Sequence, residues 1–134
     1  MVKCFRMAVL AACAFGAMSL PALAQGQSSG PIHRSPVERQ TLVQLSYALG
    51  EAHALHRLCA GPNDTTWYAR MQKLEQQEAA DENFRRQLIE SFNAGFASRE
   101  AQFARCNPMS QSAEREAASH GAALARDLAD GGDN

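Results

Sequence analysis

The chain has 134 residues and a formal net charge of −1, with 46% hydrophobic and 20% charged residues. This length suffices for one modest hydrophobic core and argues against a large multidomain architecture. Lysine and arginine form no basic cluster. Nucleic acids and anionic lipid surfaces are therefore not expected as partners, because both are normally recognised through a basic face.

The first 24 residues have the layout of a secretory signal peptide. Lys3 and Arg6 form a positive leader, an apolar run extends over residues 7–20, and a small-residue cleavage pattern ends at Ala24. The apolar run is shorter than the roughly 20 residues that a transmembrane helix needs. We therefore expect cleavage after Ala24, export to the periplasm of a bacterium, and no stable membrane insertion after cleavage.

An alternative signal lies inside this leader. Leu10-Ala11-Ala12-Cys13 is similar to the lipobox of bacterial lipoproteins, and Cys13 would then carry a lipid anchor. However, only six residues separate Arg6 from Cys13, and the following segment stays apolar where a lipoprotein usually begins a polar tether. Cleavage after Ala24 is our main interpretation. It leaves 11 basic residues against 14 acidic ones, a net charge of about −3.

The mature chain begins with a polar segment and a well-marked helix start. Residues 25–35 are rich in Gly, Ser and Gln and are expected to form a flexible leader. Ser35 is a good N-cap, Pro36 suits the first helical position, and Glu38 completes a capping box. The helix should end at Gly61, a C-cap residue. Its apolar stripe repeats every three to four residues: Leu42, Leu45, Leu49, Ala52, His56 and Cys59.

Two further helices follow a turn. Asp64 is expected to cap a second helix that ends near Ala80. Asp81 is expected to cap a third helix, whose apolar stripe extends to Cys106.

A fourth, alanine-rich helix should run over about residues 112–129. Its core face is thin: Ala113, Ala117, Gly121, Leu124 and Leu128. No strand pattern competes with these helices. We therefore predict an all-α fold, a small up-down bundle of three to four helices in residues 36–130, with a disordered tail in residues 131–134.

Two cysteines remain after the leader, and their positions predict a disulfide. An oxidising compartment favours pairing of Cys59 with Cys106. Short loops make neighbouring helices antiparallel, so the first and third helices run in the same direction and bring both cysteines to one end of the bundle. The bond would close a loop of about 48 residues and stabilise the fold by roughly 4 kcal/mol.

His53 and His56 precede Cys59 at three-residue spacing, which is compatible with a metal site. An oxidised Cys59 cannot act as a thiolate ligand, and two histidines alone make a poor site. We therefore interpret both histidines as packed or capped residues and expect no cofactor. Copper or zinc binding by His53 and His56 is the alternative.

Gly50 and Gly95 lie inside predicted helices, where a glycine costs about 1 kcal/mol. They should allow close helix approach or leave room for an aromatic ring. A small groove or ligand site is the other interpretation, with these candidate residues: Gly50, His53, Trp67, Asn93 and Gly95. Arg99 lies on the apolar side of the third helix. We expect it to pair with an acid such as Glu78 or to reach the rim.

Catalytic signatures are absent from the sequence, which contains no His-Glu-x-x-His, no Gly-x-Ser-x-Gly and no phosphate-binding glycine loop. We expect a protein that is not an enzyme and that binds another cell-envelope protein. Binding of a small ligand or metal near His53 is the second hypothesis. An enzyme of unrecognised type is the third.

A set of short segments and single residues occurs in a characteristic order along the chain: LGEAHALHRLC (49–59), Trp67 with Met71, SFNAGFA (91–97), Cys106 and HGAALARDL (120–128). In these segments the chain resembles an uncharacterised family of small exported alphaproteobacterial proteins with two well-separated cysteines, thought to form a disulfide. The likeness spans about residues 42–128. It implies the bridge between Cys59 and Cys106 and marks other positions of the family pattern: Leu49, Gly50, His53, Trp67, Phe92, Asn93, Gly95 and Arg126. It implies no activity.

Overall fold

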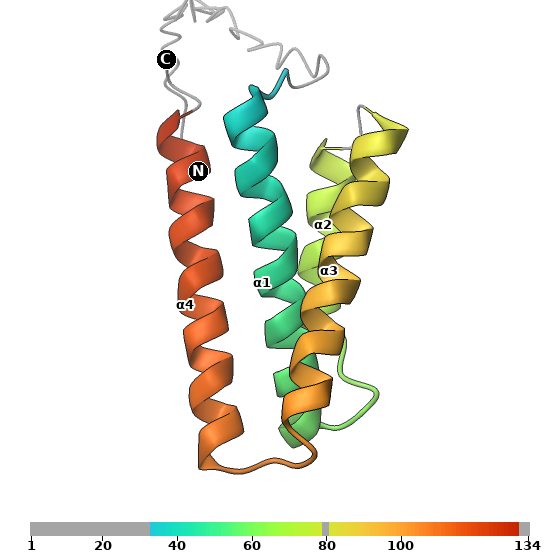
Figure 1. Cartoon of the computed structure of the whole chain (residues 1–134), viewed down its shortest axis with the longest axis vertical. Coiled ribbons are helices and arrows are strands. Elements are labelled where there is room, and N and C mark those ends of the chain that lie inside the picture. The colour runs from blue at the N-terminus through green and yellow to red at the C-terminus, as the bar shows by residue number, and fades with distance from the viewer. Residues whose placement is uncertain (1–32, 79–80, 132–134) are drawn as a thin grey trace, which may run out of the picture.

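The computed structural model describes residues 33–78 and 81–131, which form four α-helices (Figure 1). In chain order the helices are α1 (Pro36–Ala60), α2 (Thr66–Glu78), α3 (Glu82–Gln102) and α4 (Pro108–Gly131). α1 and α3 run in one direction, and α2 and α4 run in the other. The predicted all-α, up-down fold is confirmed.

Some predictions concern residues outside the described part of the chain. These are the signal peptide with its cleavage after Ala24, the alternative lipid anchor at Cys13, most of the leader 25–35, and residues 132–134 of the tail. The described part begins at His33.

The ends of α1 form as the sequence predicts. The Ser35 hydroxyl accepts a hydrogen bond from the Glu38 N–H (3.2 Å), and the Glu38 carboxylate accepts one from the Ser35 N–H (2.7 Å), which completes the capping box. The Ser35 N–H is the main cause of the lowered pKa of Glu38. At the other end, Gly61 has a φ of 104° and donates its N–H to the Arg57 carbonyl.

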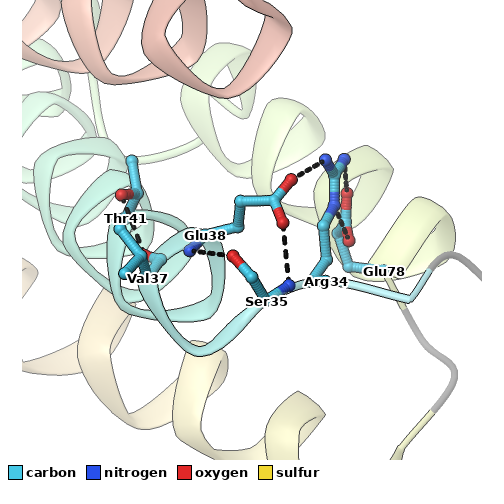
Figure 2. Close-up of polar contacts among 6 residues, drawn as sticks. All are labelled: Arg34, Ser35, Val37, Glu38, Thr41 and Glu78. Atoms are coloured by element: carbon cyan, nitrogen blue, oxygen red, sulfur yellow. Dashed lines mark hydrogen bonds and ion pairs between the residues drawn. The ribbon is translucent and has the colours of Figure 1, made fainter. Parts of the chain in front are cut away.

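Arg34 was assigned to the flexible leader, but it is held against the bundle (Figure 2). Its Nε and Nη2 donate to the two carboxylate oxygens of Glu78 (3.0 and 2.7 Å), and its Nη1 donates to Glu38 (3.1 Å). The hydrogen bond to Glu78 is the main cause of the raised pKa of Arg34. Because Glu78 is only 8% exposed, this pairing joins the start of α1 firmly to the end of α2.

Two helix ends differ from the prediction. α2 begins at Thr66, and the Asp64 carboxylate accepts a hydrogen bond from the Thr66 N–H (2.9 Å) in a turn before the helix. α3 ends at Gln102, because Phe103 takes an extended conformation. Cys106 therefore lies in the loop after α3 and not on the helix itself.

α4 is longer than predicted at both ends. It begins at Pro108, where proline suits the first helical position. The preceding Asn107 side chain accepts a hydrogen bond from the Ser110 N–H (2.9 Å), which satisfies one of the free donors of the first turn. α4 continues to Gly131.

α1 is the central helix of the bundle. It packs against α2, α3 and α4, whereas no Cα atom of α4 lies within 8 Å of a Cα atom of α2 or α3. Figure 1 shows α1 between α4 on one side and the α2–α3 pair on the other. The predicted face of α4 is buried against it: Ala113, Ala117, Gly121, Leu124 and Leu128. Among the described helices, α1 is thus the one whose backbone lies close to α4.

α1 and α3 touch backbone to backbone at two glycines. A Cβ atom on Gly50 would overlap the Phe92 carbonyl group and lie 2.9 Å from the Phe96 nitrogen. A Cβ atom on Gly95 would overlap the Tyr47 carbonyl group. Of the two interpretations of these glycines, the geometry supports close helix approach.

An interior ion pair also joins α1 to α3, with a different partner from the one expected. Arg99 Nε lies 2.8 Å from Glu51 Oε1, although its N–H is not aligned for a hydrogen bond. Arg99 thus pairs with an acid as expected, but not with Glu78, which ends α2 beside the start of α3, whereas Arg99 lies in the last turn of α3. Glu51 lies one helical turn before Leu55 on the buried side of α1.

Cys59 and Cys106 form the predicted disulfide, with their Cα atoms 4.9 Å apart. Both residues reach the same end of the bundle, as the parallel directions of α1 and α3 require. Both are exposed. Over the described residues, none of the four helices has the length and hydropathy that a membrane crossing needs.

Candidate functional site

An apolar groove runs between α2 and α4, with α1 as its floor. It has a volume of about 250 Å³. It exists because α2 and α4 both pack on α1 but do not approach each other within 8 Å between Cα atoms. We call it the α2–α4 groove.

The floor of the α2–α4 groove consists of Leu45, Ala48 and Leu49 of α1. These residues share one face of the helix because they recur at spacings of three and four. They are at most 9% exposed, so the floor is a firm part of the core. An occupant would therefore meet a preformed apolar surface.

The α4 wall is made entirely of small side chains. It comprises Ala117, Ala118, Gly121, Ala122 and Ala125. A Cβ atom on Gly121 would lie 3.6 Å from the Ala48 Cβ and 3.6 Å from the Leu45 Cδ1, an ordinary contact distance. The groove is open on this side because these residues do not extend far enough to fill it.

The α2 wall carries both an aromatic ring and positive charge. Trp67, Arg70 and Lys73 line it together with Leu74 and Gln77. The Arg70 guanidinium lies over the Trp67 ring, 4.4 Å from its centroid. Among the described residues, no carboxylate lies within 4.0 Å of the charged atoms of Arg70 or Lys73. This wall therefore presents two unpaired cations beside an apolar floor.

Towards the disulfide, the groove adjoins a shallower hollow between α1 and α4. Ala118 lines both, and His56, Cys59, Gln111 and Glu114 line the hollow. His56 Nδ1–H donates to Glu114 Oε1 (2.6 Å), and its Nε2 lies 3.6 Å from Asp64 Oδ1. His56 thus links α1 to α4 and to the turn before α2.

His53 lies on another side of α1, among aromatic rings. It is 8% exposed, and its ring centroid lies 6.1 Å from that of Tyr68, 5.7 Å from Phe92 and 5.6 Å from Phe96. Its Nδ1 has no hydrogen-bond partner among the described residues. Burial is the main cause that lowers the pKa of His53, and the nearby Arg57 charge adds to it. His53 is therefore packed in the core as a neutral ring.

The two histidines have separate surroundings. Both nitrogens of His56 face carboxylates, whereas His53 is enclosed by rings from α2 and α3. Within residues 33–78 and 81–131, no group of three or more His, Cys, Asp or Glu side chains is arranged to hold a metal ion. The geometry favours structural roles for His53 and His56 over the copper or zinc alternative.

The structure brings together only part of the candidate set from the sequence. Trp67 lines the α2–α4 groove, but Gly50, His53, Asn93 and Gly95 do not. Asn93 is exposed on α3. The sequence did not identify the cations Arg70 and Lys73 or the small residues of α4 as parts of a groove. The alanine-rich composition of α4 was the available signal.

Fold and site together define a small, disulfide-linked helical domain with an apolar groove along its central helix. Comparison with family models matches residues 36–131 to a family described as a protein of unknown function, DUF2385. The chain belongs to this family. No curated protein and no solved structure gave a significant match. The expectation that the chain belongs to a family of unknown function is confirmed.

Proposed function

We propose that the mature chain is a non-enzymatic periplasmic module that binds another protein of the cell envelope through the α2–α4 groove. The observation that carries this proposal is the groove itself, with an apolar floor of Leu45, Ala48 and Leu49. Preformed apolar grooves between helices are recurrent binding sites for segments of partner proteins.

The size of the groove favours a protein segment over a cofactor. Pockets that hold small molecules usually measure roughly 300–1,000 Å³, whereas this groove has about 250 Å³ and is only partly enclosed. Such a space can receive a few apolar side chains of a partner that continues across its rim. The periplasmic location is supported by the signal-peptide pattern and by the oxidised cysteine pair.

In-cell photo-crosslinking tests the proposal. A photoreactive amino acid replaces Ala122, an exposed residue of the α4 wall, and in a matched variant it replaces Ala94, an exposed residue of α3. Mass spectrometry of the products should identify one dominant envelope protein captured from Ala122 and little of it from Ala94. Equal capture at the two positions, or a scatter of abundant periplasmic proteins, would contradict the proposal.

A separate measurement tests the proposed periplasmic location. Intact mass of the protein recovered from the periplasm should correspond to residues 25–134 with two hydrogens fewer than the reduced chain. A membrane-bound product that begins at an acylated Cys13 would instead favour the lipoprotein alternative.

A further inference from the structure

We infer that the occupant of the α2–α4 groove is an amphipathic helix of the partner, with acidic side chains that face Arg70 and Lys73. This inference rests on the proposed function and specifies the chemistry of the partner. It follows from the shape of the groove, from the position of the two cations, and from the distribution of apolar side chains on the rest of the surface.

The shape of the groove suits a helix. Its floor and both walls are helices, and the α4 wall extends from Ala117 to Ala125, roughly 12 Å at 1.5 Å per residue. That length corresponds to about two helical turns. Because the α4 wall has only alanine and glycine side chains, the backbone of an incoming helix can approach α4 closely. Side chains at positions i, i+3 or i+4 of that helix would then reach Leu45 and Leu49 on the floor.

The charge is confined to one side of the groove. Arg70 and Lys73 are three residues apart on α2 and therefore lie on the same face of the helix, one turn from each other. The opposite wall has no charged side chain. A helix that enters the groove thus meets positive charge along one flank only. Acidic residues spaced by three or four positions along that flank would pair with both cations.

A second copy of this chain does not supply such a helix. Among the described residues, the exposed large apolar side chains are Val37, Tyr68 and Met109. They lie on α1, α2 and α4 respectively. No described helix therefore presents two large apolar anchors on its outer face, and a different protein is the better occupant.

Lys73 makes a direct chemical test possible. The only lysines of the chain are Lys3 and Lys73, so after cleavage at Ala24 the sole side-chain amine lies on the groove rim. A carbodiimide activates a carboxylate, the Lys73 amine displaces the urea by-product, and an amide bond forms with net loss of one water molecule. Applied to the periplasmic fraction, it should join Lys73 to an Asp or Glu of the protein that is captured from Ala122.

Two variants distinguish the effect of the positive charge on partner binding from the reactivity of the Lys73 amine. Lys73→Arg keeps the positive charge but removes the amine, so it should abolish the crosslink at position 73 and retain photo-capture from Ala122. The double variant Arg70→Glu with Lys73→Glu should reduce photo-capture at least tenfold, because like charges now face each other. Circular dichroism of both variants checks that the bundle still folds.

Each outcome supports or overturns the inference. Coupling of Lys73 to an acidic residue within an amphipathic helix of the captured protein supports it. Undiminished capture by the charge-reversed variant overturns the inference, although the proposed function stands. Coupling or capture that yields a second copy, a lipid or a non-helical segment also overturns it. Absence of capture at Ala122, together with capture at Ala94, removes the groove as the binding surface.

Discussion

The two long interfaces of α1 are built in different ways. Against α3, the backbones themselves are in contact, and neither Gly50 nor Gly95 has room for a Cβ atom. Against α4, contact is made through side chains, and Gly121 has room for one, with Ala48 and Leu45 at 3.6 Å. Three helical glycines that look equivalent in the sequence therefore have two different roles.

This difference separates a fixed half of the molecule from an adaptable half. The α1–α3 pair also has the Glu51–Arg99 ion pair, and the disulfide ties the end of α1 to the loop after α3. Among the described helices only the α1 backbone comes within 8 Å of α4 between Cα atoms, and the contact between them includes the partly buried His56–Glu114 pair. We therefore expect α4 to adjust its position around an occupant more readily than the floor of the groove does.

Removal of the disulfide should have the largest effect on this fixed half. The double variant Cys59→Ser with Cys106→Ser loses a bond that spans 47 positions in sequence. We expect the free energy of unfolding to fall by about 4 kcal/mol, since the unfolded chain is no longer restrained. Urea unfolding of the exported protein measures this change. A loss well below 1 kcal/mol would show that the bond does not stabilise the bundle.

Substitution of Gly50 by alanine tests the close contact between α1 and α3. The added methyl group must displace the Phe92 backbone, so we expect a loss of about 3 kcal/mol in the free energy of unfolding. Gly95→Ala should behave in the same way because of the Tyr47 carbonyl. Thermal or urea unfolding provides the measurement. If Gly50→Ala were neutral, the two helices would have to be further apart than described here.

His53, which packs beside Phe92 and Phe96 of α3, should have a smaller and pH-dependent effect on the free energy of unfolding. Burial and Arg57 lower its pKa from the ordinary 6.5, while Asp64 opposes the shift. Below pH 6.5 the unfolded chain therefore binds a proton that the folded chain does not, and the free energy of unfolding falls as the pH decreases.

Unfolding measured between pH 8 and pH 5.5 checks this expectation. His53→Leu should flatten the pH dependence, whereas His120→Ala, at an exposed position on α4, should leave it unchanged. An identical slope in the His53 variant would show that this residue is charged in the folded protein or exposed to water.

Gly121→Ala should change the free energy of unfolding least, and should raise it, whereas the cysteine and Gly50 variants lower it. The new methyl group meets Ala48 and Leu45 at ordinary contact distance, and alanine is the better helix former by about 1 kcal/mol. We expect the free energy of unfolding to rise by about 0.5–1 kcal/mol. A loss comparable to that of Gly50→Ala would remove the distinction between the two interfaces.

Local signals explain which parts of this structure were predictable from the sequence. The capping residues Ser35 and Glu38 specify the start of α1 within one turn of chain, and Asp81 does the same for α3. The disulfide was predictable because only one pair of cysteines remains after the leader, and the parallel directions of α1 and α3 bring Cys59 and the loop with Cys106 to the same end of the bundle. The end of α3 was missed because apolar periodicity continues past Gln102 into the loop.

The groove arises from contacts between helices, and these contacts cannot be predicted from any short stretch of the sequence. The buried stripe of α4 predicts that the helix packs, but not that α1 is its only neighbour. In the same way, the pairs Arg34–Glu78 and Arg99–Glu51 depend on which helix segments the fold brings together. Arg34 precedes the first helix, and nothing in its sequence neighbourhood assigns it to the core.

Residue-resolved hydrogen exchange of the mature, oxidised chain tests the division of the molecule most directly. Amides buried between α1 and α3 should open only with the highest free energies, whereas amides of α4 should open at clearly lower free energies, because only the α1 backbone approaches α4 within 8 Å between Cα atoms among the described helices. Equal protection of α3 and α4, or opening of α3 before α4, would contradict the account.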